Sequence, residues 1–235
     1  SGRGRGVLGG CCGSGGGGGG KCGRMARVGA GGGGRGRVIV EGYDRAAGSP
    51  PGGVEALQQA GDAARGAMRY VTLESCDHHG RTPPCTQTII ASRVARVVAA
   101  MRDPDPRVDG RGFASLRAAG IQIEEDVLAP QAERLNEAFL TRVREGRPFV
   151  LLKLAMTFDG RVAVPGRRYL VDTPAVRFVH RLRARSDAVM VGIGTILADD
   201  PNLTVRAGRG PDPLAVILDT DARPPRTSNV GCAPA

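Results

Sequence analysis

The sequence contains no tryptophan, and aromatic residues make up only 3% of its 235 positions. A hydrophobic core must therefore be built from aliphatic side chains, and the hydrophobic share of 41% is large enough to supply one. No apolar run approaches the ~18 residues that a membrane-spanning helix needs. The composition therefore predicts a folded protein with no membrane association.

Acidic residues are missing from the first 40 positions, which carry seven basic residues. Of the formal net charge of +10, only +3 therefore remains for residues 41–235. Glycine runs at residues 15–20 and 31–34 bury too little surface to offset the loss of chain entropy. We therefore expect residues 1–36 to form a disordered Gly/Arg-rich tail, with order beginning near Arg37. Because the excess positive charge lies in this tail, we expect no nucleic-acid partner.

The six cysteines do not follow the spacing of a disulfide framework. Only Cys76 and Cys85 share a motif, which covers residues 74–85 and reads ESCDHHGRTPPC. Two cysteines on a loop that enters a helix suit zinc binding, because a thiolate is stabilised near a helix N-terminus. The alternative interpretation is a pair of buried structural thiols.

Short β-branched runs alternate with helix-forming segments along most of the chain, which is typical of an α/β fold with parallel strands. In the first part we expect strands over 38–40, 70–73, 94–101 and 121–123, and helices over 54–64, 85–91, 113–119 and 130–145. In the second part we expect strands over 149–155, 188–192 and 214–218, and a helix over 173–185. The sequence therefore predicts two units, residues 37–146 and residues 147–235.

The motif at residues 74–85 resembles the pyrimidine deaminase half of the bifunctional deaminase–reductase of riboflavin biosynthesis. Residues 36–43 and 54–57 also fit that family. The resemblance implies a cytidine-deaminase-like three-layer α/β/α domain over residues 37–146.

One segment of the deaminase half departs from the family pattern. Where the family has Pro-His-Ala-Glu, this chain has Pro50, Pro51, Gly52 and Gly53. By the resemblance, Pro51 replaces a zinc-binding His and Gly53 replaces the catalytic Glu. A zinc deaminase needs three protein ligands, and it needs a Glu that moves protons between the attacking water and the departing ammonia.

The remaining metal ligands implied by the resemblance are Cys76 and Cys85. Two ligands bind zinc poorly, so we expect neither firm zinc binding nor deaminase activity. The alternative is that His78 or His79 supplies the third ligand.

Residues 148–206 resemble the reductase half of the same family, which has a dihydrofolate-reductase-like fold and uses NADPH. The matching stretches are residues 152–161, 168–170, 180–184 and 191–206. The resemblance implies the N-terminal part of that α/β domain over residues 147–235.

The two ligands of such a reductase carry phosphate groups, which arginine binds through two parallel hydrogen bonds. The resemblance implies that the substrate is contacted by Arg167, Arg183, Leu203 and Arg206. It implies that NADPH is contacted by Ala155, Tyr169, Thr195, Asp199 and Thr220. Lys153 is a candidate substrate-side cation, and Gly192 and Gly194 permit close approach of the backbone to the dinucleotide.

The resemblance implies an oxidoreductase of riboflavin biosynthesis, which reduces 5-amino-6-(5-phosphoribosylamino)uracil with NADPH and, because Pro51 and Gly53 replace the ligand and the base, carries an inactive deaminase-like domain. One alternative is a non-catalytic copy that acts as a scaffold. Another is a bifunctional zinc deaminase and reductase hidden by a faulty gene model. The resemblance predicts a small-molecule phosphoribosyl pyrimidine as partner and is compatible with a homodimer. It predicts a cytoplasmic location, or a plastid location in a plant or alga.

Overall fold

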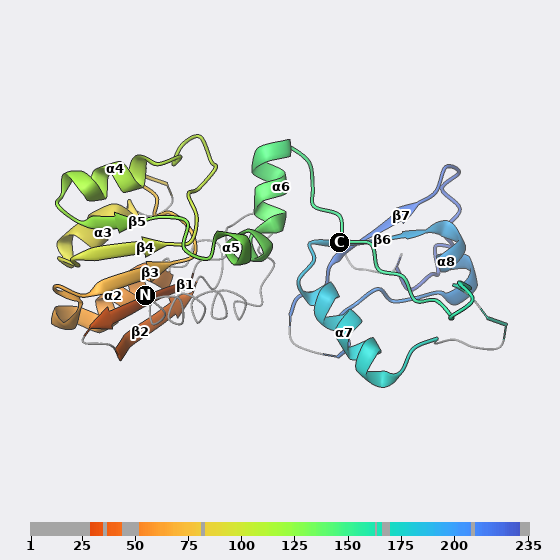
Figure 1. The fold of residues 1–235 in the computed structure, drawn as a ribbon. Helices are drawn as coiled ribbons and strands as arrows, with labels where there is room; N and C mark the ends of the chain where they lie inside the picture. The colour runs from red at the N-terminus through yellow and green to blue at the C-terminus, as the bar shows by residue number, and fades with distance from the viewer. Residues whose placement is uncertain are drawn as a thin grey trace. The chain divides into compact units, whose positions relative to one another are not determined.

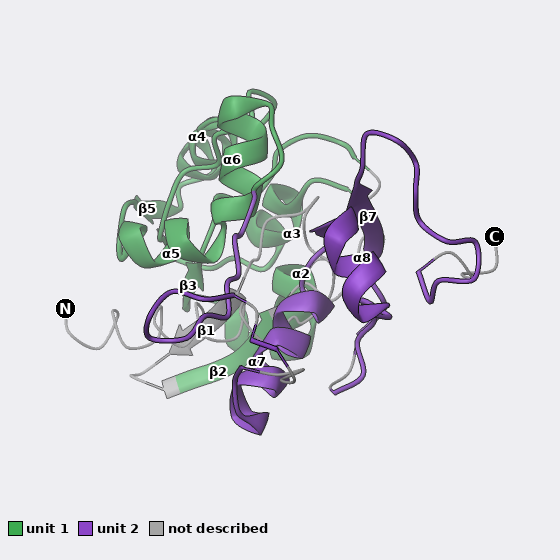
Figure 2. Ribbon diagram, turned by 90° about the vertical axis from the view of Figure 1, so that its right-hand side faces the viewer, with its two compact units in different colours: residues 1–149 green, residues 150–235 purple. Residues whose placement is uncertain are grey.

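The computed structural model of the chain describes residues 29–34, 37–43, 52–80, 83–162, 164–165, 170–207 and 210–230. The chain divides into two compact units, residues 1–149 and residues 150–235 (Figure 2). The boundary expected from the sequence follows residue 146. Most of the expected tail, residues 1–28, lies outside the described residues.

The first unit is built on a five-stranded sheet with the strand order β2-β1-β3-β4-β5 (Figure 1). The strands are β1 (Gly29–Gly34), β2 (Arg37–Tyr43), β3 (Met68–Val71), β4 (Arg96–Ala99) and β5 (Gln122–Glu124). Strands β3, β4 and β5 run parallel, whereas β1 is antiparallel to both β2 and β3. The expected α/β class with parallel strands is confirmed.

Strand β1 lies inside the segment that composition predicts to be disordered. Its glycine run pairs with β3, where Gly31 lies opposite Tyr70 and Gly33 lies opposite Met68. A ladder uses backbone N–H and C=O groups, so glycine can pair between two strands although it loses the most conformational entropy. The expectation that order begins near Arg37 is therefore wrong for Gly29–Gly34.

Helices cover both faces of this sheet. The helices α2 (Gly52–Ala60), α3 (Cys85–Ala91) and α4 (Arg111–Ala118) contribute to one core cluster, and α5 (Ala129–Leu135) and α6 (Glu137–Glu145) contribute to another. Successive residues of β4 alternate between the two clusters, with Val97 and Ala99 in the first and Val98 in the second. The strand is therefore buried on both sides. A short 3-10 helix, Gly61–Ala64, follows α2.

The single helix expected over 130–145 is instead two helices that meet at Asn136. This residue has φ −106° and ψ 13°, and it is only 2% exposed. Its Nδ2 donates a hydrogen bond to the carbonyl oxygen of Ala132 at 3.0 Å. A side chain that bonds locally to the backbone competes with the helical pattern, which the apolar periodicity of the sequence does not reveal.

The second unit contains the parallel strands β6 (Ala188–Gly192) and β7 (Leu214–Leu218), with the helices α7 (Thr173–Ala184) and α8 (Ile193–Asp199). Asp172 caps α7 by accepting a hydrogen bond from the backbone nitrogen of Ala175 at 3.1 Å. The sequence did not predict α8, because a short segment that contains a glycine gives a weak helical signal. Among the described residues, no helix has the length and apolar character needed to cross a membrane.

The strand expected over residues 149–155 is wrong. These residues are described, but they belong to no strand, and the sheet formed by the described residues of this unit pairs β6 with β7. An apolar run becomes a strand only where a neighbouring strand supplies hydrogen-bond partners. The side chains of Val150, Leu152 and Leu154 are instead 73%, 76% and 59% exposed.

Adjacent isoleucines on α3 test the position of the first core. Ile89 is fully buried, whereas Ile90 is 38% exposed. We expect Ile89→Ala to lower the free energy of unfolding of this unit by about 2–5 kcal/mol, because the change leaves a cavity. The matched control Ile90→Ala should cost less than about 1 kcal/mol. Hydrogen exchange of the first unit in increasing urea measures both values, and equal losses would contradict the assigned core.

Candidate active sites

The cysteine motif follows β3 and ends on α3, so that its two ends meet. The backbone nitrogen of Thr86 donates to the carbonyl oxygen of Cys76 at 3.3 Å. The Sγ atoms of Cys76 and Cys85 are also 3.3 Å apart, and both side chains are half-buried. The hydrogen bond between the two thiols, with a smaller contribution from nearby His78, lowers the pKa of the Cys76 thiol to about 6. The two cysteines of the motif therefore lie side by side.

Glu74, the first residue of the motif, is buried and only 4% exposed. Its carboxylate accepts hydrogen bonds from the backbone nitrogens of Asp103 at 3.2 Å, Gly110 at 2.9 Å and Phe113 at 3.2 Å. These bonds fasten the end of β3 to the loop after β4 and to the first turn of α4. Since the carboxylate is committed to three donors, Glu74 serves the structure of the site.

The glycine at the start of α4 permits this close packing. A Cβ atom on Gly112 would lie 2.0 Å from the carbonyl oxygen of Ser75 and 3.2 Å from Oε1 of Glu74. A contact of 2.0 Å with a backbone oxygen cannot be relieved by a side-chain rotation. The approach of α4 to the motif therefore requires glycine at this position.

Asp77 joins the motif to two helices. Its carboxylate accepts hydrogen bonds from Oγ1 of Thr86 on α3 and from Oγ of Ser115 on α4, the second at 2.6 Å. By the resemblance the family has Ser at this position, and the longer carboxylate of Asp77 reaches both hydroxyl groups. The motif is thus held at both of its ends.

Asp103 is a candidate residue that the sequence analysis missed. It follows β4 and is 8% exposed, and its Oδ1 accepts from the backbone nitrogen of Asp105 at 2.9 Å. Burial raises the pKa of the Asp103 carboxyl to about 6, and the neighbouring acidic groups Asp105, Glu74 and Cys76 add to the rise. The signal for this residue in the sequence is an acidic side chain four positions after the end of a buried strand.

The expected zinc ligands do not form a complete set. Within the part of the chain that the structure describes, no three His, Cys, Asp or Glu side chains are grouped to hold a metal ion. Pro51 lies outside the described residues, and a proline side chain has no ligand atom. Of the alternative ligands, His78 is half-buried and His79 is exposed, and neither completes a group of three. These residues do not fit zinc.

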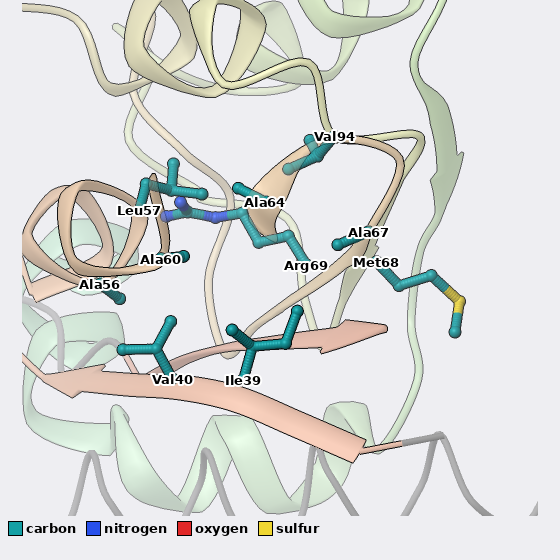
Figure 3. Close-up of a pocket in the computed structure, with 10 residues that line it drawn as sticks. All are labelled: Ile39, Val40, Ala56, Leu57, Ala60, Ala64, Ala67, Met68, Arg69 and Val94. Carbon is teal, nitrogen blue, oxygen red and sulfur yellow. The ribbon is translucent and has the colours of Figure 1, made fainter. Parts of the chain in front are cut away.

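Gly53 stands where the resemblance places the catalytic Glu. It is buried on α2, and its carbonyl oxygen accepts a hydrogen bond from Nη1 of Arg69 at 2.9 Å. Figure 3 shows Arg69 reaching from β3 toward α2 in a pocket whose other lining residues, among them Ile39, Leu57 and Val94, are apolar. Because this pocket offers no acid, base or nucleophile, we assign it no catalytic role.

In the second unit, three of the expected substrate contacts meet where α7 packs against the loop of residues 203–206. Nη1 of Arg183 donates to the carbonyl oxygen of Thr204 at 3.2 Å, and Leu203 is 4% exposed. The backbone nitrogen of Arg206 donates to Nδ1 of His180 at 3.3 Å. We call these residues the α7–loop junction.

His180 begins one of the stretches that match the family, residues 180–184, but the sequence alone indicates no role for it. It is 4% exposed, and its ring nitrogen holds the backbone of the loop. Burial is the main cause that lowers the pKa of His180, and the charges of Arg183 and Arg206 lower it further. A lowered pKa favours the neutral ring, whose Nδ1 lone pair accepts from the backbone nitrogen of Arg206.

Three of the expected NADPH contacts lie beyond the same end of the β6–β7 sheet. Gly192, at the end of β6, lies opposite Leu218, at the end of β7, in a parallel ladder. Thr195 and Asp199 on α8 and Thr220 after β7 therefore follow the carboxyl ends of adjacent parallel strands, and all three are exposed. In open α/β sheets, ligands bind at this edge.

Two glycines leave space at the same edge. A Cβ atom added to Gly192 or to Gly194 would meet no atom within 4 Å, and neither residue has a positive φ. The fold of this unit therefore does not require glycine at either position, and the space is open to a ligand. Beside it, Asn229 binds Asp200 through hydrogen bonds of 2.8–2.9 Å and holds the end of α8.

The other expected site residues are not joined to this edge by strand pairing. Ala155 is half-buried and Lys153 is exposed, and both lie in the irregular segment that replaces the expected strand. Arg167 and Tyr169 lie outside the described residues.

Comparison with known proteins identifies the family. Residues 148–233 match the model of the RibD C-terminal domain. The chain is 49% identical over 181 residues to the riboflavin biosynthesis protein RibD of Escherichia coli K12, which covers 76% of this chain and 49% of that protein. The solved structure of Acinetobacter baumannii RibD (form 1) superposes with a TM-score of 0.89 at 36% identity, over 97% of this chain and 66% of that chain. The chain belongs to the RibD family.

Other RibD proteins match with similar extent. RibD of Aquifex aeolicus is 42% identical over 206 residues, which are 86% of this chain and 58% of that protein. The Thermotoga maritima structure of a diaminohydroxyphosphoribosylaminopyrimidine deaminase and 5-amino-6-(5-phosphoribosylamino)uracil reductase matches with a TM-score of 0.75 at 43% identity, over 82% of this chain and 56% of that one. The chain thus spans about half the length of the curated relatives it matches.

Asp103 gives the first unit a measurable dependence on pH. An unfolded Asp titrates near pH ~3.9, whereas the folded carboxyl keeps its proton up to pH about 6. Protonation therefore favours the native state in this window, and the stability contributed by Asp103 falls as the pH rises through it. Asp103→Asn cannot ionise and keeps an oxygen that accepts from Asp105. We expect the variant to be more stable than the wild type at pH 7, by up to about 3 kcal/mol, with the two converging below pH ~4.

Urea unfolding between pH 3.5 and 8 measures the difference between the two chains. The control Asp105→Asn should act in the opposite direction at pH 7, because the hydrogen bond from Arg107 lowers the pKa of Asp105 to about 2. Equal stability of wild type and Asp103→Asn at every pH would show that burial does not hold the Asp103 proton.

Proposed function

We propose that this RibD-family chain acts in riboflavin biosynthesis and carries the N-terminal part of an NADPH-dependent reductase of 5-amino-6-(5-phosphoribosylamino)uracil. The observation that carries the proposal is the α7–loop junction. There the Arg183 side chain donates to the backbone of Thr204, and the backbone of Arg206 donates to His180. By the resemblance, both arginines occupy substrate-contact positions. A phosphoribosyl substrate needs such a pair, since its phosphate carries close to two negative charges.

Each residue of the junction has a separate part in substrate binding. Arg183 and Arg206 bind the ribose phosphate, and buried Leu203 supplies the apolar contact on the same loop. His180 is a positioning residue, because it accepts from the backbone of Arg206 and does not itself reach the phosphate in this assignment. The further substrate contact predicted by the resemblance is Arg167.

NADPH supplies a hydride to C1′ of the substrate when it is bound. The residues that would hold it are Thr195, Asp199 and Thr220 at the edge of the β6–β7 sheet, where Gly192 and Gly194 leave open space. Ala155 and Tyr169 are the other two positions predicted by the resemblance. The fit of the second unit to a dinucleotide rests on this open space and not on the glycine spacing alone.

The first unit, in this proposal, is a cytidine-deaminase-like domain that has lost its reaction. Gly53 has no carboxylate to move protons, and the described donor set around Cys76 and Cys85 does not fit zinc. No contact described above favours the alternatives of a non-catalytic scaffold or of a working bifunctional enzyme. The homodimer and the cytoplasmic or plastid location remain predictions.

Gly194→Ala separates cofactor binding from folding. We expect the wild-type chain to bind NADPH and the variant to bind it at least about tenfold more weakly, a loss of ~1.4 kcal/mol, because the methyl group fills the open space. The fold should not suffer, since the added Cβ meets no atom within 4 Å and Ala is favoured over Gly in a helix by about 1 kcal/mol.

Calorimetric titration with NADPH, together with thermal unfolding, measures both effects. The matched control is Ala198→Gly on the same helix, which lowers helix propensity without adding an atom and should leave the affinity within about threefold. The proposal would be contradicted if the wild type showed no saturable binding up to about 1 mM NADPH. Equal affinities of the wild type and Gly194→Ala would contradict it as well.

A further inference from the structure

The two cysteines of the motif are placed for a chemistry other than metal binding. Their Sγ atoms are 3.3 Å apart, and a disulfide bond is about 2.05 Å long, so small side-chain rotations bring them within bonding distance. Both side chains are half-buried, so a small molecule can reach them. We propose that Cys76 and Cys85 form a redox-active pair, which a low-molecular-weight disulfide oxidises reversibly to an internal disulfide.

The backbone holds the pair together without a metal ion. A disulfide requires Cα atoms about 4.4–6.8 Å apart, and the hydrogen bond between the Thr86 nitrogen and the Cys76 oxygen keeps the two segments side by side. Asp77, the neighbour of Cys76, accepts hydrogen bonds from Thr86, the neighbour of Cys85, and from Ser115 on α4. The thiols are therefore neighbours because of contacts that do not involve sulfur.

The donor set also favours thiol chemistry over zinc. A structural or catalytic zinc site needs at least three protein ligands, and among the described residues no third His, Cys, Asp or Glu side chain is grouped with the pair. The family pattern implies a His beside the two cysteines, and this chain has Pro51 at that position. We base the redox assignment on this difference.

The reaction balances with glutathione disulfide as the oxidant. The sulfur of one cysteine attacks one sulfur of glutathione disulfide, the S–S bond of the oxidant breaks, and one glutathione leaves as a thiol with the proton of the attacking cysteine. The second cysteine then attacks the protein sulfur of this mixed disulfide and releases the second glutathione with its own proton. The pair loses two electrons and two protons, and one glutathione disulfide becomes two glutathione thiols.

A redox titration of the full chain tests the proposal. Cys11, Cys12, Cys22 and Cys232 are replaced by Ser, the chain is equilibrated with mixtures of reduced and oxidised glutathione, and thiols are trapped with N-ethylmaleimide before mass spectrometry. We expect a species that is two hydrogen atoms lighter, carries no glutathione and contains linked peptides of Cys76 and Cys85. Because the fold holds the thiols together, it should form at about tenfold lower oxidant than in a chain unfolded by urea.

The control Cys85→Ser in the same background should instead accumulate a glutathione adduct on Cys76. Separate glutathione adducts on both cysteines of the unsubstituted pair would overturn the proposal. So would an oxidant requirement equal to that of the unfolded chain. Binding of one zinc ion per chain that blocks alkylation of both thiols in reduced buffer would overturn it as well, and would restore the metal interpretation.

Discussion

The buried carboxylate of Glu74 is the constraint on which the first unit depends. It accepts three backbone hydrogen bonds, from residues that lie 29, 36 and 39 positions further along the chain. A buried donor left without an acceptor costs about 1–3 kcal/mol, so removal of this one group would leave the loop after β4 and the first turn of α4 without their partner. The burial of Asp103 follows from that attachment, whereas the cysteine pair is held together by the bonds of Asp77 and by the bond between Thr86 and Cys76.

Local and periodic features of this chain were predictable from sequence. The continuous apolar run at residues 97–100 predicts a strand, and the alternation of strands with helices along the chain predicts parallel pairing. The cysteine motif indicated a loop between a strand and a helix, where the structure places it. Each of these signals is carried by neighbouring residues, so a single sequence contains it.

Features that depend on distant partners were not predictable. The role of Glu74 requires knowledge of which backbone nitrogens meet it, and those belong to other elements. Strand β1 was missed because its pairing uses only backbone groups, which composition does not record. The opposite error occurred at residues 149–155, where a strand-like composition is present but no strand of the described residues pairs with it.

The two units differ in how much of their apolar surface is covered. The first has a core on each face of its sheet, whereas the second leaves Met190 59%, Leu214 68% and Leu218 57% exposed on its two strands. Even so, the α7–loop junction is fixed by hydrogen bonds within the second unit, because Arg183 and His180 each bond to the backbone of the 203–206 loop. The chemistry proposed for each unit therefore rests on contacts inside that unit.

We propose that the residues of this chain, and not its fold, remove the deaminase reaction. The most direct measurement compares the wild type with a chain in which Pro51→His and Gly53→Glu restore the missing ligand and base. Zinc content and ammonia release from the diaminopyrimidine substrate are measured on both. We expect less than about 0.1 zinc per chain and no ammonia above background for the wild type, and close to one zinc with measurable ammonia release for the restored chain. Ammonia release by the unaltered chain would show that Pro51 and Gly53 do not abolish the deaminase reaction.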